Sequence, residues 1–408
     1  MKNRTVIAVS LGIAFSILTT SVVPVSEANA ADGHKQISAS VTASNKIKVK
    51  WKPTTGVKYY QVRTAATADG KIEVKKYKTK KTSLTVKPTK SASAASGNYT
   101  FVRVYAYKKN GKIGISSYVK IRLNPTVPQA DASRTSVATF NVRTAAEETK
   151  GHTWAQRLPA IAAQINSSGA EIIAVQEAGA VMDKTIYGPY NYDIDWQFEQ
   201  LERAVDSKYE LTNSQTYGDY GKEGTRILYD SSKYTLGATG VIDPGHTTKA
   251  LTRWIPWAEL IDSTGKKLYV ISVHLDNRKD TGKSKKLYEL RKEQTRSVVE
   301  LAKRLGSGGA QVIIAGDFNS NIYSTPDNGA QKVAVNGGFY DTYATKNNIN
   351  EFYFTANPKW TKPKKSASRT DYIFTYGLLK GSYSYKNFIV KSGVIPSDHY
   401  MQLAVLPY

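Results

Sequence analysis

The pattern of apolar and polar residues changes near residue 130 of this 408-residue chain. Before that point the apolar residues come in short alternating runs, such as Ile47-Lys48-Val49-Lys50-Trp51, which are typical of half-buried strands. Turn signals such as Lys109-Asn110-Gly111 separate the runs, and no helical period interrupts them. The pattern therefore predicts an antiparallel β-sandwich over residues 31–123, with Trp51 in its core.

A different pattern begins at residue 134, where buried strands alternate with amphipathic helices. A strand over residues 136–142 is followed by apolar residues at helical spacing from Trp154 to Ile165, and Ser168-Gly169 marks the end of that helix. Further buried strands are predicted at 171–175, 227–229, 268–273, 311–315, 371–374 and 402–406, and a second helix at 285–305. This alternation predicts a layered α/β domain over residues 134–408.

The segment between the two regions has no periodicity. It runs from Asn124 to Ala130 and contains two prolines, which favour a stiff, extended chain. We therefore interpret residues 124–133 as a linker between two domains.

The first thirty residues have the features of a secretory signal peptide. Lys2 and Arg4 precede an apolar run over residues 6–23, and Ala28-Asn29-Ala30 supplies a cleavage site after Ala30. The alternative is an uncleaved membrane anchor, which the serines and threonines within the run disfavour. We expect the mature protein to be secreted, with no membrane span. It has no cysteine, which excludes disulfides and thiolate zinc sites.

The positive charge is concentrated in the first region. The whole chain carries a net charge of +24, but residues 31–130 hold 21 Lys and Arg against 3 Asp and Glu, a net +18. Residues 131–408 hold 34 against 29, a net +5. Such a field attracts polyanions, so residues 31–123 are expected to contact nucleic acid, cell-wall polymer or an anionic surface. The alternative is a solvated face that only aids solubility.

Residues suited to metal and acid-base chemistry stand at the ends of the predicted strands. Each one alone could cap a turn or lie in solvent, but ligand groups in layered α/β folds gather at strand ends. The residues concerned are Asn141, Glu177, His274, Asp317, Asn319, Asp371, Asp398 and His399. Their regular placement predicts one shared site.

These residues carry a resemblance to a known superfamily. The motifs are Thr139-Phe140-Asn141-Val142, Val175-Gln176-Glu177, Ser272-Val273-His274-Leu275, Gly316-Asp317-Phe318-Asn319, Arg369-Thr370-Asp371-Tyr372-Ile373 and Ser397-Asp398-His399. They resemble the endonuclease/exonuclease/phosphatase superfamily, which includes pancreatic-type DNases, abasic-site endonucleases, neutral sphingomyelinases and inositol-polyphosphate phosphatases. The resemblance spans residues 137–408 and implies a four-layered α/β sandwich. Thr370 replaces the apolar residue common before the aspartate. The first region, through Trp51, Leu84 and the 102–106 run, resembles a fibronectin type III domain.

The resemblance implies a divalent metal ion, with Mg²⁺ first and Mn²⁺ or Ca²⁺ as alternatives. Glu177 would be the principal ligand, with Asn141 and Asp398 nearby, while Asp317 and Asn319 would complete an oxygen-rich pocket. Hard cations such as Mg²⁺ prefer oxygen donors. One metal ion and two metal ions both remain open.

The resemblance also implies the acid-base groups. His399 would be the general base, oriented by Asp371, while His274 would contact the scissile phosphate or protonate the leaving oxygen. Glu223 would support His274, and whether His399 or Asp317 activates the water stays open. The remaining histidines, His34, His152 and His246, are interpreted as surface residues.

The substrate is predicted from a loop and from the charge. The loop at 357–365 places Trp360 among lysines that include Lys362 and Lys364, a mixture that suits a nucleic-acid strand. A solvated basic loop is the alternative. We predict a monomeric extracellular nuclease acting on DNA or RNA. A sphingomyelinase-like phospholipid enzyme, a small-molecule phosphodiesterase or phosphatase, and a surface-binding adhesin are the other candidates.

Overall fold

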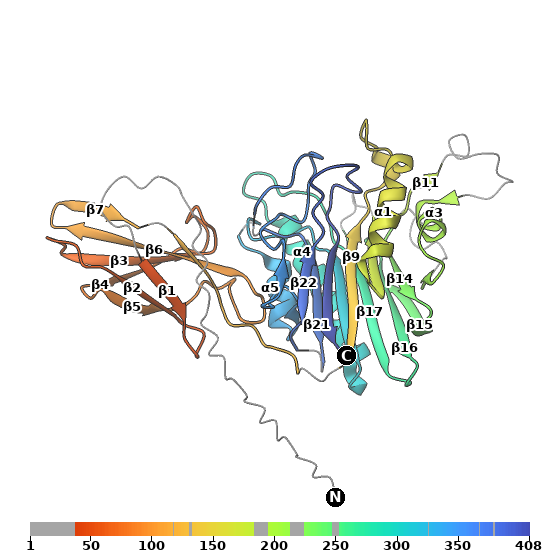
Figure 1. Ribbon diagram of the computed structural model, residues 1–408, viewed down its shortest axis with the longest axis horizontal. Coiled ribbons are helices and arrows are strands. Elements are labelled where there is room, and N and C mark those ends of the chain that lie inside the picture. Colours follow the sequence, from red (N-terminus) through yellow and green to blue (C-terminus); the bar gives the residue numbers. More distant parts are fainter. Residues whose placement is uncertain are drawn as a thin grey trace, which may run out of the picture.

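A computed structural model describes residues 37–116, 118–129, 133–182, 195–212, 224–246, 253–324, 326–366, 368–377 and 380–408. The predicted signal peptide, His34 and Glu223 lie outside these ranges. Figure 1 shows two bodies side by side, an all-β module in red and orange and a larger α/β domain. No helix within the described ranges is long and apolar enough to cross a membrane.

The module contains two sheets that enclose one core. Among the described residues, β1, β2 and β5 form one sheet, while β4, β3, β6 and β7 form the other, with β8 paired to β6. The strands are β1 (Ile37–Val41), β2 (Ile47–Trp51), β3 (Tyr59–Ala65), β4 (Lys75–Thr79), β5 (Ser83–Val86), β6 (Tyr99–Lys108), β7 (Gly111–Ile115) and β8 (Val119–Arg122). Trp51 packs in the shared core with Val62 and Val104, as predicted. The fibronectin type III resemblance itself stays a prediction.

The α/β domain is built around two larger sheets. In the described ranges one sheet has the order β13-β14-β10-β9-β23-β22-β20 and the other β15-β16-β17-β18-β21-β19. The strands of the first are β13 (Tyr209–Leu211), β14 (Arg226–Asp230), β10 (Ile172–Gln176), β9 (Arg134–Asn141), β23 (Gln402–Pro407), β22 (Ser384–Asn387) and β20 (Asn348–Ile349). Those of the second are β15 (Tyr234–Ile242), β16 (Ile255–Asp262), β17 (Lys267–His274), β18 (Gln311–Asp317), β21 (Asp371–Tyr376) and β19 (Tyr340–Asp341). A small pair, β11 (Val181–Met182) and β12 (Asp195–Trp196), lies apart from both.

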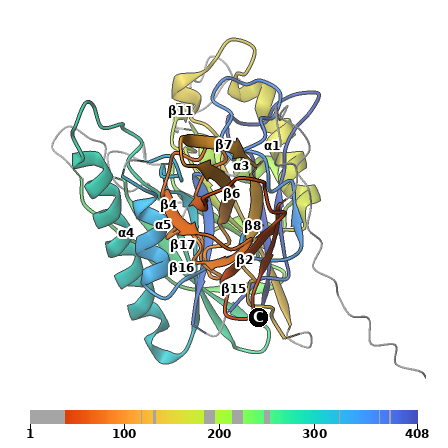
Figure 2. The same cartoon turned by 90° about the vertical axis from the view of Figure 1, so that its left-hand side faces the viewer.

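Helices cover the outer face of each sheet. In the described part of the chain the helices are α1 (Trp154–Ser168), α3 (Gln197–Ala204), α4 (Lys286–Leu305) and α5 (Gly329–Asn336), with short 3₁₀ turns at Ala145–Glu147 and Gly306–Gly308. One core lies under α1 and α3, a second between the sheets, and a third under α4 and α5. Figure 2 shows the two helix pairs on opposite flanks. The four-layered α/β sandwich is therefore confirmed.

The predicted helices and buried strands are present, while two long strands were missed. Helix α1 begins at Trp154 and is followed by Gly169, and α4 ends at Leu305, as the periodicity indicated. The strands β15 and β16 gave no clear signal, because β15 contains Gly237 and Gly240 and β16 contains Pro256. Glycine and proline weaken the pattern by which strands are recognised.

Strand pairing brings distant motifs together at one edge. The parallel pair β9 and β10 sets Asn141 beside Gln176, immediately before Glu177. In the second sheet, β17 and β18 set His274 beside Asp317, and β18 and β21 set Asp317 beside Asp371. Gly316 allows this close packing, since a Cβ there would lie 1.9 Å from the carbonyl oxygen of Val273. The register therefore brings five of the six motifs to neighbouring strand ends in the two sheets.

Candidate active site

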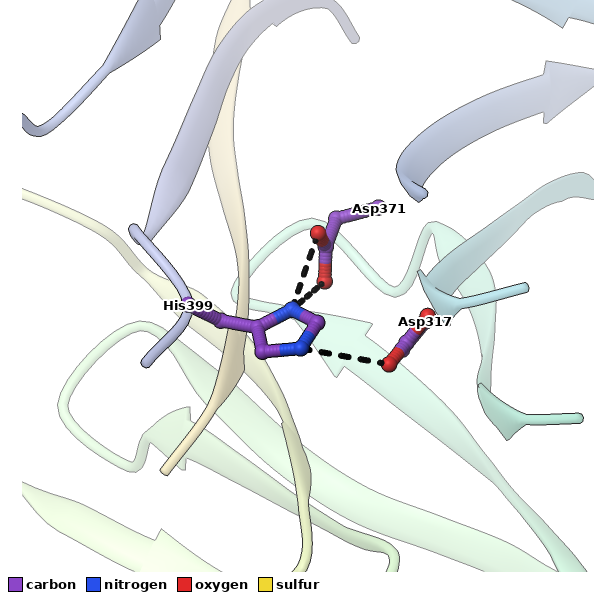
Figure 3. Close-up of side chains that lie close together, drawn as sticks. All are labelled: Asp317, Asp371 and His399. Atoms are coloured by element: carbon purple, nitrogen blue, oxygen red, sulfur yellow. Dashed lines mark hydrogen bonds and ion pairs between the residues drawn. The ribbon is translucent and has the colours of Figure 1, made fainter. Parts of the chain in front are cut away.

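His399 lies between two buried carboxylates (Figure 3). Its Nδ1 is 3.0 Å from Asp371 Oδ1, and its Nε2 is 3.7 Å from Asp317 Oδ2. Asp371 begins β21 and Asp317 ends β18, so both carboxylates are fixed by the sheet. A carboxylate accepts hydrogen bonds, so Asp371 holds the proton on Nδ1 and leaves Nε2 directed at Asp317.

One of the two carboxylates, Asp317, and the imidazole of His399 have shifted pKa values. Burial and the neighbouring charge of Asp371 raise the pKa of Asp317 to about 7. Burial alone would lower the pKa of His399, but Asp371 and Asp317 raise it well above its usual value. Groups that titrate near neutrality inside a buried site are suited to proton transfer.

Glu177 stands opposite this group with a constrained backbone. Its φ of 63° is unusual for a residue with a side chain, and such strain is often found at functional sites. Asn141 Nδ2 donates to Glu177 Oε1 at 2.9 Å and to Asp317 Oδ2 at 3.2 Å. The amide of Thr144 donates to Glu177 Oε2 at 3.1 Å. Asn141 therefore joins the carboxylates that come from the two sheets.

Asp398 completes the acidic group, and two arginines accompany it. Its Oδ2 lies 3.7 Å from Nη1 of Arg143, which is 3.8 Å from Glu177 Oε2. Burial raises the pKa of Asp398. Arg157 of α1 is buried and donates to the carbonyl oxygens of Val142 and Pro396. These bonds fix the segments that carry Asn141 and Asp398. Neither arginine was predicted from the sequence, although Arg143 directly follows the Asn141 motif.

His274 lies deep in the site beside a third arginine that the sequence analysis missed. Arg253 Nη1 lies 3.1 Å from Nδ1, and a guanidinium only donates, so Nε2 carries the proton of the neutral ring. That Nε2 is buried, has no hydrogen-bond partner among the described residues, and lies 3.8 Å from Glu177 Oε1. Burial and the charge of Arg253 lower the pKa of His274 well below its usual value. A neutral N–H donor aimed into the site fits contact with a phosphoryl oxygen.

Asn319 shapes the loop after β18. Its φ is 45°, its amide N–H donates to Asp317 Oδ1 at 2.8 Å, and its Nδ2 donates to the carbonyl oxygen of Leu275 at 2.9 Å. The Asn319 side chain therefore ties the loop that bears Asp317 to the loop that follows His274.

The predicted substrate loop lies close to Asp398. The indole of Trp360 stacks on the imidazole of His152, with centroids 4.3 Å apart and planes at 16°. The amide of Asn357 donates to the carbonyl oxygen of Asp398, which anchors the loop. His152 is therefore not a free surface residue, and it covers one face of Trp360. Lys362 and Lys364 are exposed.

The donor set fits a hard divalent cation. Among the described residues, Asp317, Asp371 and His399 offer ligand atoms within 4.8 Å of one another. Glu177 and Asp398 supply carboxylate oxygens on the other side of the site, and Mg²⁺ and Ca²⁺ prefer such donors. Asn141 directs its Nδ2 at Glu177 and Asp317, while its Oδ1 accepts from the amide of Arg143. His274 Nε2, protonated by the argument above, is not available as a ligand.

This combination of layered sheets, oxygen donors and a histidine held by a carboxylate defines a class of metal-dependent hydrolases of phosphate esters. The model of the Endonuclease/Exonuclease/phosphatase family matches residues 138–399, more than half of the chain. The protein belongs to that family, whose members hydrolyse phosphoesters and typically use a divalent metal ion. No curated protein matches the chain.

Solved structures with the same fold come from several bacteria. An endonuclease/exonuclease/phosphatase family protein from Bacteroides thetaiotaomicron is 21% identical, with a TM-score of 0.54, covering 68% of this chain and 98% of its own. A mannosyl-6-phosphatase from the same species is 22% identical, with a TM-score of 0.54, covering 67% and 100%. A functionally unknown protein from Enterococcus faecalis is 20% identical, with a TM-score of 0.51, covering 67% and 100%. At these identities the likeness shows the fold and leaves the substrate open.

Proposed function

We propose that the protein is an extracellular phosphodiesterase that hydrolyses nucleic acid with the help of a divalent cation. The observation that supports its chemistry best is the position of His399 between Asp371 and Asp317. The observation that supports a long polyanionic substrate is the charge of the module, in which basic residues outnumber acidic ones by 18 over residues 31–130. Export, indicated by the N-terminal segment, would bring the enzyme to nucleic acid outside the cell.

The proton acceptor in this proposal is the pair formed by His399 and Asp317. A water held at His399 Nε2 gives its proton to this pair, while Asp371 keeps the ring in place. His274 Nε2–H donates to a phosphoryl oxygen, where negative charge develops during attack. Glu177 and Asp398 would hold the cation, and Asn141 would orient Glu177 through its Nδ2. When bound, the cation would neutralise charge on the phosphate and on the leaving oxygen.

In the described part of the module, Asp69 and Glu73 form their hydrogen bonds and ion pairs away from the lysines on the outer faces of the sheets. Asp69 accepts from Thr67, and Glu73 accepts from the amide of Ser91 and faces Lys332 of the α/β domain at 3.6 Å. Lysines on the outer faces of both sheets remain exposed, namely Lys48, Lys50, Lys76 and Lys78. We name these four residues the basic face.

Aromatic rings lie among the cations on the outer side of the five-stranded sheet. Tyr59 and Tyr107 stack with centroids 4.8 Å apart, and Lys78 lies 4.2 Å from the centroid of Tyr59. The guanidinium of Arg63 lies 3.9 Å above Tyr105. A surface that combines cations with aromatic rings suits nucleic acid, which presents both phosphates and bases.

The proposed substrate is tested by assaying the purified mature chain with Mg²⁺, Mn²⁺ or Ca²⁺. The substrates are plasmid DNA, RNA, sphingomyelin, a sugar phosphate and bis(p-nitrophenyl) phosphate. We expect cleavage of DNA or RNA at rates well above those for the lipid and the sugar phosphate. Preferential hydrolysis of sphingomyelin or of the phosphomonoester, with intact plasmid, would replace the nuclease by the corresponding alternative.

Replacing the four residues of the basic face with alanine should weaken binding to long DNA and flatten its salt dependence. Binding that releases counterions falls by roughly 10³-fold or more between 50 and 200 mM salt for six or more phosphate contacts. On duplex DNA each lost contact should reduce the logarithmic salt slope by about 0.9. Fluorescence anisotropy with labelled DNA at several salt concentrations measures both quantities.

The matched control removes four exposed lysines from the α/β domain, Lys283, Lys285, Lys286 and Lys303. It changes the net charge equally, so a general electrostatic effect would weaken binding in both proteins alike. Equal affinity and slope in the basic-face variant and in the unmodified protein would leave those lysines as a solubility device.

A further inference from the structure

The module and the α/β domain lie side by side (Figure 1), and the contact between them is buried. Arg122, at the end of β8, donates to the carbonyl oxygen of Thr345 at 2.9 Å and pairs with Glu351 at 2.6 Å. The backbones also touch, since a Cβ at Gly97 would lie 2.6 Å from Cα of Ala344. The amide of Asp341 donates to the carbonyl oxygen of Ala95 at 2.8 Å. The module is thus packed against the α/β domain in addition to being joined by a linker.

An aromatic cluster fills this contact. Its buried members come from both bodies and are Tyr99, Phe101, Tyr343 and Tyr385. Two guanidinium groups lie close to the ring of Tyr343, that of Arg122 of the module 4.5 Å and that of Arg369 of the α/β domain 3.9 Å from its centroid. One tyrosine of the α/β domain therefore contacts a cation from each body.

A chain of hydrogen bonds runs from the module into the α/β domain. Asn98 Nδ2 donates to Gln331 Oε1 at 2.7 Å, and Gln331 Nε2 donates to Asp341 Oδ2 at 2.7 Å. Asp341 is fully buried and accepts from both terminal nitrogens of Arg369, at 2.5 and 3.1 Å. A buried ion pair depends on all of its hydrogen-bond partners, because an unmatched buried charge is costly.

This ion pair lies beneath the catalytic loops. Arg369 is two residues before Asp371, and its carbonyl oxygen accepts from Tyr372 Oη at 2.8 Å. The next carbonyl oxygen, that of Thr370, accepts from the amide of Phe318 at 2.8 Å, one residue after Asp317. The segment that Arg369 anchors therefore holds the two aspartates that flank His399.

We propose that the module is a positioning part of the catalytic unit. Through Asn98 and Arg122 it holds Gln331, Tyr343 and the Asp341–Arg369 pair, and thereby the spacing of Asp317 and Asp371 around His399. This role is separate from any capture of a polyanion, because none of the interface residues belongs to the basic face. It rests on the proposed function only for its kinetic test, since the physical coupling of the two bodies can be measured without substrate.

The kinetic test uses full-length Asn98→Ala and Arg122→Ala on bis(p-nitrophenyl) phosphate with saturating Mg²⁺. Displacement of reacting groups by about 1 Å can cost about 10²-fold in rate, so we expect kcat to fall by about 10-fold or more while KM stays within about two-fold. Arg122→Lys keeps the charge opposite Glu351 and should restore part of kcat. The matched control, Lys87→Ala, removes an exposed cation of the module and should leave kcat unchanged.

Differential scanning calorimetry separates this proposal from the proposed function. We expect the unmodified protein to unfold in one transition and Arg122→Ala to unfold in two, because the contact couples the bodies. If the protein hydrolyses no phosphodiester, the proposed function fails, and calorimetry still decides the coupling. Two independent transitions in the unmodified protein, or normal kcat in both interface variants, would overturn the positioning role.

Discussion

Replacing His399 with alanine should lower kcat by roughly 10²- to 10⁴-fold, the range that a positioned acid-base group contributes. The imidazole is the only group in the described part of the site that contacts both Asp371 and Asp317 through its two nitrogens. Steady-state kinetics on bis(p-nitrophenyl) phosphate measure the loss, and the melting temperature shows that the protein remains folded. Activity within a few-fold of the unmodified enzyme would remove His399 from the proton-transfer step.

Asp371→Asn should lower kcat less than His399→Ala, because the imidazole survives without its charged partner. Residues that act as a unit give overlapping losses, so the double variant should be no slower than His399→Ala alone. Losses that multiply in the double variant would show that the two residues act independently.

Asp371→Asn should also shift the dependence of kcat/KM on pH. In the proposed mechanism, activity requires the His399 and Asp317 pair to be free to accept a proton. The pKa values of both groups are raised, that of Asp317 to about 7. kcat/KM of the unmodified enzyme should therefore decline as the pH falls through neutrality. Asp371→Asn removes a negative charge that raises both pKa values, so the acid limb should shift to lower pH. An unchanged limb would contradict this electrostatic account.

Glu177→Gln should abolish metal-stimulated hydrolysis while leaving the fold intact. Glutamine has the same size as glutamate, so the backbone of residue 177, with its φ of 63°, should be undisturbed. Glutamine lacks the negative charge that a hard cation requires. Removing the metal ion with a chelator should abolish the activity of the unmodified enzyme, and added Mg²⁺ should restore that activity. Ligands that bind only the folded state raise its melting temperature, so the Mg²⁺-dependent increase should also disappear in Glu177→Gln.

Glu171→Gln is the matched control for this experiment. Glu171 precedes the same strand, β10, at its opposite end, where it pairs with Lys233. The same chemical change there should preserve both Mg²⁺ stimulation and the thermal shift. Full Mg²⁺ stimulation in Glu177→Gln would exclude Glu177 as a necessary ligand.

Much of the fold and the core of the candidate site could be predicted from the sequence. The buried strands stand out as apolar runs, and polar residues such as Asn141, His274 and Asp317 interrupt those runs where the strands end. The register of the strands then brings these ends together, so residues that are far apart in the sequence form one cluster in the folded domain. The family resemblance supplied roles that spacing alone could not.

The surroundings of the site could not be predicted in the same way. Arg253 and the His152–Trp360 pair come from loops, where no periodicity indicates which side chains meet. The links from Asn98 to Gln331 and from Arg122 to Glu351 join residues far apart in the chain, and each appears as an ordinary polar residue in the sequence. Contacts that depend on the docking of two bodies leave no local signal.

The position of β23 has a consequence for how this domain folds. β23 pairs with β9, the first strand of the α/β domain, and β9 also pairs with β10, so the centre of one sheet joins opposite ends of the domain sequence. Strands so far apart in the sequence pair slowly, because the long chain between them must first be brought into a closed loop, and this costs entropy before any contact forms. While the chain is still being synthesised, β9 lacks its partner on one side. The α/β domain should therefore complete its first sheet, and become active, only after residues 402–407 have emerged from the ribosome.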